Sequence, residues 1–77
     1  MTKQAIREEK KFCSKRIRLL QKEIMAETDQ SIALTKLEEM TALAHRAATL
    51  DAMYTKLVSD EFDQTVNKLL DNIMKRV

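Results

Sequence analysis

Six basic side chains near the start of the chain have the spacing of one helix face. Steps of three or four residues separate them in the row Lys3, Arg7, Lys11, Lys15, Arg18 and Lys22. Because residues three and four apart lie on the same side of an α-helix, this row predicts a basic stripe. Such a stripe suits contact with nucleic-acid phosphates or with the acidic surface of a protein.

The stripe contains none of the residues that would make nucleic-acid recognition more specific. Its row holds no aromatic side chain for base stacking and no Asn or Gln for base edges. Three interpretations stay open: a solvated helix face, a surface for an acidic protein partner, and a phosphate-binding surface. Binding flat on a membrane is disfavoured, because this helix has no Trp and needs its apolar side for packing.

Arg16 is the one charged residue bracketed by apolar neighbours, among them Phe12, Cys13, Leu19 and Leu20. It could hold a carboxylate or phosphate in a pocket, although an ion pair with another helix is the commoner role. Phe12 and Leu19 repeat at seven residues, which makes them either core residues or a docking line. The candidate partner-binding residues are therefore Lys3, Arg7, Lys11, Phe12, Lys15, Arg16, Arg18, Leu19 and Lys22.

The other reactive residue types do not assemble a catalytic or metal centre. Cys13 is the only cysteine and occupies a seam position, which predicts a buried thiol. His45 is the only histidine and has no ligand-type residue at metal-binding spacing. Asp60, Glu61 and Asp63 lack the central Gly and distal Glu of a calcium loop. We therefore expect no enzymatic activity, no cofactor and no metal.

Composition predicts an all-α fold. The 77 residues include no Gly and no Pro, and 44% of them are hydrophobic. Without Gly, tight turns and bulges are disfavoured, and without Pro nothing forces a helix to break. A chain of this length is predicted to form a single helical-bundle domain over residues 1–77.

A first helix is expected over residues 3–27. Its apolar seam, with steps near those of a heptad repeat, is Ile6, Cys13, Ile17, Leu20 and Ile24. Glu9, Arg16 and Glu23 repeat at seven residues beside the seam. We expect these three to form interhelical ion pairs, which set the orientation of neighbouring helices more than their stability.

Two later stretches are rich in helix-capping residues and divide the rest of the chain. Thr28–Ser31 separates the first helix from a second over residues 31–58, and Ser59–Asp63 separates the second from a third over residues 60–76. The apolar stripe of the second helix begins with Ala33, Leu37, Met40, Ala44 and Ala47, and it continues around one edge with Leu43, Leu50, Tyr54 and Leu57. The expected protomer is an antiparallel helical hairpin plus a third helix, a three-helix bundle.

An alternative merges the second and third helices. Leu50, Tyr54, Val58, Phe62, Val66, Leu69 and Ile73 also read as one continuous stripe. A merged helix of about 45 residues would be about 68 Å long at 1.5 Å per residue. The first helix could not cover it alone, so this alternative predicts an obligate dimer.

Charge is distributed unevenly along the chain. Residues 1–25 hold eight Lys and Arg against three Glu, and the remainder holds six basic against nine acidic side chains. No segment resembles a secretory leader or a membrane span, so we expect a soluble, cytoplasmic protein.

These features favour a small non-enzymatic helical protein–protein interaction module, such as an adaptor, a regulator or a chaperone-like subunit. It is expected to self-associate and to bind a protein with an acidic or amphipathic helical surface. Met25 and Met53 lie off the main stripes and are predicted to form the rim of the bundle. The alternative function is a nucleic-acid-binding helical dimer that uses the basic stripe on phosphates.

Overall fold

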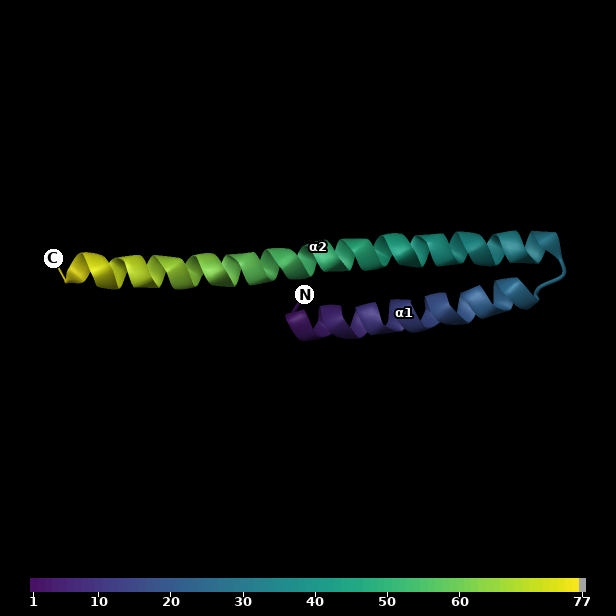
Figure 1. Ribbon diagram of the computed structural model, residues 1–77, viewed down its shortest axis with the longest axis horizontal. Helices are drawn as coiled ribbons and strands as arrows, with labels where there is room; N and C mark the ends of the chain where they lie inside the picture. Colours follow the sequence, from purple (N-terminus) through teal and green to yellow (C-terminus); the bar gives the residue numbers. More distant parts are fainter. Residues whose placement is uncertain (77) are drawn as a thin grey trace.

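The computed structural model describes residues 1–76, which form two antiparallel helices joined by a turn over residues 27–29. Helix α1 spans Lys3–Ala26 and helix α2 spans Gln30–Lys75. Figure 1 shows α1 lying beside the half of α2 that follows the turn, while the other half of α2 continues past the N-terminus. The molecule is therefore a rod with extents of 73 × 16 × 15 Å. The all-α prediction and the antiparallel hairpin are confirmed.

Side-chain caps set the start of each helix. Thr2 Oγ1 accepts a hydrogen bond from the Ala5 N–H at 3.1 Å, at the start of α1. Asp29 Oδ1 accepts from the N–H groups of Ser31 and Ile32 at 2.9 and 3.3 Å. These oxygens satisfy first-turn donors that have no partner inside the helix. The predicted break at Thr28–Ser31 is confirmed, with Asp29 as the capping residue.

The predicted break at Ser59–Asp63 is wrong, and with it the three-helix bundle. Helix α2 runs unbroken from Gln30 to Lys75 through these residues. A capping side chain stabilises a helix start, but it does not stop a helix that already supplies partners for every N–H. Without Gly or Pro here, continuing the helix keeps all of those hydrogen bonds. The alternative in which the second and third helices merge therefore gives the observed number of helices. The obligate dimer that goes with this alternative stays a prediction.

A narrow apolar seam holds the hairpin together. Among residues 1–76, four side chains are fully buried: Ile6, Cys13, Leu20 and Leu50. The partly buried side chains packed around Ile6, Cys13 and Leu50 are Leu43, Ala47, Met53, Tyr54 and Leu57. The burial predicted for Cys13 is confirmed, since its side chain is 2% exposed.

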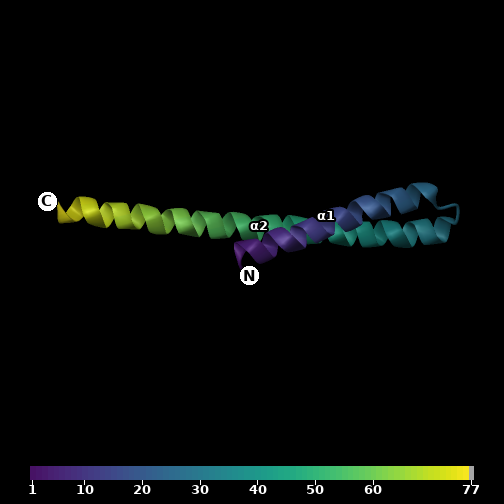
Figure 2. The same cartoon turned by 90° about the horizontal axis from the view of Figure 1, so that it is seen from below.

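Met53 corrects a prediction, because it packs against the core rather than lying on the rim. Figure 2 shows the reason: α1 crosses α2 obliquely, so different sides of α2 meet α1 along its length. Near its N-terminus α1 comes close to Met53, and Ile6, Met53 and Leu57 line one common depression. Met25 is 89% exposed, at the opposite end of α1.

Ion pairs fix the register of the two helices. Glu9 pairs with Arg46 at 2.7 Å, Arg16 with Glu39 at 3.1 Å, and Glu23 with Lys36 at 3.8 Å. The predicted interhelical pairing of Glu9, Arg16 and Glu23 is thereby confirmed. The signs alternate every seven residues, so sliding α1 by one heptad towards the C-terminus of α2 would place Arg16 opposite Arg46. It would also place Glu23 opposite Glu39, so both contacts would become repulsive.

The C-terminal part of α2 has no helix beside it, and we call residues 62–76 the arm. The last ion pair between the helices joins Lys3 to Glu61, immediately before the arm. Figure 1 shows the arm, coloured green to yellow, projecting alone beyond α1. Five of its large apolar side chains are more than half exposed, namely Phe62, Leu69, Leu70, Ile73 and Met74, whereas Val66 is half-buried.

The continuity of α2 can be tested with proline at the former boundary. Ser59→Pro removes a backbone donor from the helix interior and should cost about 3 kcal/mol of helix stability. We expect a loss of the helical circular-dichroism signal and faster amide hydrogen exchange over residues 57–63. Ser59→Ala places a better helix former at the same position. It should leave the helical signal unchanged or larger, and amide hydrogen exchange over residues 57–63 unchanged or slower. Equal signals from the two variants would show that α2 is interrupted at residue 59.

Candidate interaction surfaces

The basic stripe divides into two parts in the structure. Lys3 pairs with Glu61 at 2.5 Å. Arg7 lies over the ring of Tyr54, 5.3 Å from its centroid, and donates a hydrogen bond to the Tyr54 hydroxyl. These two cations therefore hold α1 against α2, and an Arg–Tyr contact of this kind adds a cation–π attraction. Both cations are thus engaged in contacts with α2, although Arg7 is exposed.

The other four stripe residues lie on the outer side of α1, away from α2. They are Lys11, Lys15, Arg18 and Lys22, and all four are exposed. Within the described chain, no ion pair joins any of them to an acidic side chain. Four uncompensated cations spread over three turns of helix make this side of the rod electropositive.

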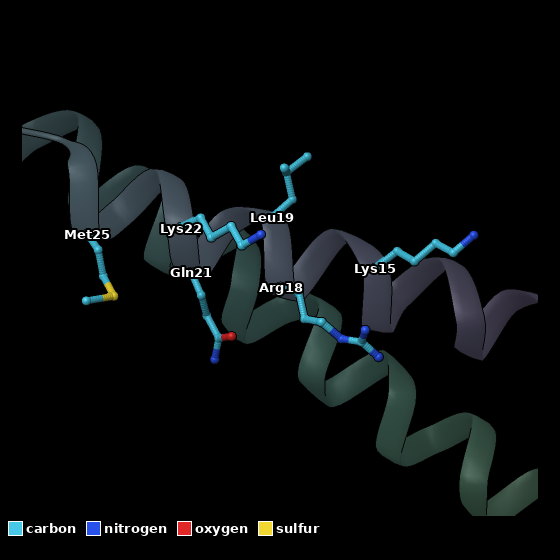
Figure 3. A pocket seen from close by; sticks show the side chains of 6 residues that line it. All are labelled: Lys15, Arg18, Leu19, Gln21, Lys22 and Met25. Atoms are coloured by element: carbon cyan, nitrogen blue, oxygen red, sulfur yellow. The ribbon is translucent and has the colours of Figure 1, made fainter.

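Apolar side chains lie beside these cations in a shallow depression on α1. Figure 3 shows the six side chains that line it, namely Lys15, Arg18, Leu19, Gln21, Lys22 and Met25. They splay away from one another and converge on no common point (Figure 3). A small ligand needs a concave site that surrounds it. This surface therefore lacks the concave shape of a small-ligand site.

Arg16 and the Phe12–Leu19 line have separate roles. Arg16 forms two hydrogen bonds to Glu39, Nε to Oε1 at 3.1 Å and Nη2 to Oε2 at 3.4 Å. The hydrogen bond with Glu39 raises the pKa of Arg16 above its ordinary value. Arg16 is thus an interhelical ion-pair residue. Phe12 and Leu19 are 64% and 49% exposed, so they are not core residues in this hairpin.

A second apolar surface runs along α2, and we call it the second stripe. Its members, spaced by three and four residues apart from a seven-residue gap that spans Asp51, are Leu37, Thr41, Ala44, Ala48, Thr55, Val58, Phe62, Val66, Leu69 and Ile73. At 100° per residue, Leu57 lies within about 20° of Leu50, whereas Phe62 lies about 120° away from it. The second stripe therefore faces a different direction from α1. All of its members are exposed except Val66, which is half-buried.

Sequence reasoning missed this stripe as a separate surface. The sequence places Leu37 and Ala44 in one apolar stripe with Leu43 and Leu50, but Leu37 is 42% exposed and Ala44 is also exposed. The residues that do face α1 include Leu43, Leu50 and Leu57, which repeat at seven. The spacing of Leu37, Ala44 and Thr55 with the arm residues was the signal that could have separated the two surfaces.

The second stripe adjoins a groove between the two helices near the turn. Gln21, Ile24 and Met25 contribute to it from α1, and Leu37 and Met40 contribute from α2. Leu37 thus belongs to both the stripe and the groove. An apolar side chain lying over Leu37 would also reach the wall formed by α1.

Comparisons with protein families, with curated proteins and with solved structures give no match. Neither helix, over the part of the chain that the structure describes, has a stretch long and apolar enough to cross a membrane. Over the same residues, His, Cys, Asp and Glu side chains do not gather in a group of three that could hold a metal ion.

Neighbouring arginines on α1 test the assignment of the two charged faces. Arg16→Gln should lower the thermal midpoint at low salt, because it leaves Glu39 without its partner. Arg18→Gln should leave the midpoint unchanged, because Arg18 has no acidic partner. Thermal unfolding followed by circular dichroism measures both. A larger loss for Arg18→Gln would contradict the interhelical role of Arg16.

Proposed function

We propose that the protein is a small non-enzymatic helical protein–protein interaction module that works as an adaptor, a regulator or a chaperone-like subunit. The observation that supports this proposal is the arm, a helix whose large apolar side chains have no cover. Phe62 is 67% exposed and Met74 is 73% exposed. Contiguous apolar surface of this kind marks interaction sites in soluble proteins.

Energetics favour a partner for the arm. An isolated helix of about 15 residues is marginal in water, because nucleation is costly and packing supplies most helix stability. Burying one Leu or Ile side chain contributes about 1.5–3 kcal/mol. A partner that covers Leu69, Leu70 and Ile73 would gain several such contributions and would hold the arm helical.

The partner class follows from the shape and charge of the rod. An amphipathic helix fits best, since the arm and the groove beside Leu37 are elongated and apolar. Lys11, Lys15, Arg18 and Lys22 add an electropositive side, which favours a partner that carries acidic residues. The module is thus suited to a protein with an acidic or amphipathic helical surface, a second copy included.

The arm can be tested by polar substitution. Leu69→Ser with Ile73→Ser should weaken association by at least about tenfold, since two buried apolar side chains are lost. The control is Asn67→Ser with Asn72→Ser, at exposed polar positions of the same arm. Light scattering measures self-association, and affinity capture with mass spectrometry detects other protein partners.

We expect the wild type and the control to associate with themselves or with a captured protein, and the arm variant to lose that contact. The substitutions lie outside the hairpin core, so the thermal unfolding of the hairpin serves as the folding check. Wild-type protein that stays monomeric and captures nothing that the arm variant loses would overturn the proposal.

A nucleic-acid-binding role is the second candidate, and the four unpaired cations of α1 support it. Phosphate contacts release counterions, so binding through them should weaken steeply as salt rises. Fluorescence anisotropy with mixed-sequence duplex DNA and with RNA should show binding at 20 mM salt and little at 200 mM. Lys15→Gln with Lys22→Gln should reduce the salt dependence. No binding at the lower salt concentration would eliminate this candidate.

A further inference from the structure

We infer that the partner of the arm is a second copy of this chain, paired along the second stripe with α2 antiparallel to its counterpart. This inference rests on the proposed function and names the partner of the same surface. In this pairing the numbers of two facing residues add up to 110. Thr55 therefore faces Thr55 of the other copy and lies at the two-fold axis. The arm of each copy then covers the outer side of the other copy's hairpin.

Apart from Val58, whose counterpart position is Ala52 outside the stripe, the second stripe is palindromic about Thr55. Going outwards towards the C-terminus it meets Phe62, Val66, Leu69 and Ile73. Going outwards towards the N-terminus it meets, at the same distances, Ala48, Ala44, Thr41 and Leu37. A two-fold axis across two antiparallel helices requires this property, because each patch must face its own symmetry mate.

Side-chain sizes in this register are complementary. Phe62 faces Ala48 and Val66 faces Ala44, so a large residue meets a small one in each layer. Leu69 faces Thr41 in the next layer. Alternation of large and small residues lets facing helices interdigitate at native density without voids. From Thr41 to Ala48 the hairpin part of the stripe is small, and the facing residues from Phe62 to Leu69 are large; only the end pair, Leu37 and Ile73, joins two large residues.

A parallel arrangement of the same stripe is disfavoured by charge and by size. In register, it would place Asp51 against its own copy and Phe62 against its own copy, while Ala44 and Ala48 would leave gaps. In the antiparallel register Asp51 faces Ser59 instead. Asp51 is also paired with Lys10 of α1, which neutralises it at this edge.

The groove near the turn receives the end of the arm. Ile73 faces Leu37 in this register, and Leu37 lines the groove together with Ile24, Met25 and Met40. Met25, which is exposed, therefore lies where an incoming apolar side chain would contact it. Met is well suited to adapt to such a contact. This groove extends the interface from α2 onto α1.

The extent of the pairing meets the requirement of a stable dimer. Facing surfaces from Leu37 to Ile73, with their flanking positions, engage about 20 residues on each copy, which is the lower end of a standard interface. Such an interface removes about 800 Å² of surface from each partner. The single chain exposes 6398 Å². The second stripe lies about 120° around α2 from the side that contacts α1, so covering it leaves the hairpin contacts in place.

Engineered cysteines test the pairing and its register. Thr55→Cys lies at the two-fold axis and should form a disulfide-linked dimer on mild oxidation. Ala48→Cys is the matched control, because copies of position 48 lie 14 residues of register apart, about 21 Å, and should not cross-link. A mixture of Ala48→Cys and Phe62→Cys should form the mixed disulfide. Wild-type protein, with its buried Cys13, gives the background.

Light scattering of the wild type over a range of concentrations accompanies the cross-linking, and we expect the mass of a dimer. Cross-linking by Ala48→Cys alone would overturn the antiparallel register. A wild-type monomer at every concentration would overturn the second copy as partner. In that case, capture of a different protein that the arm substitutions abolish would leave the proposed function standing, so the two failures are distinguishable.

Discussion

The structure depends on a mismatch in length between its two helices. α1 has 24 residues and α2 has 46, and a turn over residues 27–29 forces them to start side by side. α1 can therefore cover only the first half of α2, whatever the side chains prefer. The fold therefore has two parts. In the hairpin the two helices pack against each other, and in the arm α2 is helical but has no helix packed against it.

Ion pairs hold α1 in its register on the first part of α2, so that the arm stays uncovered. The alternating pairs of Glu9, Arg16 and Glu23 allow one register of α1 on α2, and a shift of one heptad towards the arm would make two of them repulsive. The apolar side chains also move from the α1-facing side of α2 at Leu57 to a different side at Phe62. This change likewise keeps α1 from covering the arm. Even a longer α1 would meet the side of the arm rather than its apolar face. The arm is thus directed away from its own hairpin by both charge and geometry.

Much of the hairpin could be predicted from the sequence, and the second half of α2 could not. Local signals are sufficient for α1, for the cap at Asp29 and for the burial of Cys13, because each depends on residues close together in sequence. Ser59–Asp63 has the same local signals as Asp29, yet the helix continues there. Whether a cap is used depends on whether the chain gains contacts by turning, and no local pattern contains that information.

The surfaces show the same distinction. The basic row is readable from its spacing, but only the structure shows that Lys3 and Arg7 contact α2 while Lys15 and Lys22 do not. The second stripe was hidden because two apolar lines on one helix overlap in a linear reading. Assigning each residue to a line requires knowing where α1 lies.

The small size of the core has a consequence for how the protein behaves as its abundance changes. With four fully buried side chains over residues 1–76, the hairpin has little stability to spare. Anything that binds the folded rod adds to that stability in proportion to the logarithm of its own concentration. The fraction of chains that are folded therefore depends on the concentration of any such binding molecule as well as on the sequence. On the proposed function, chains without their partner open more often than bound chains, because only the bound state gains this added stability.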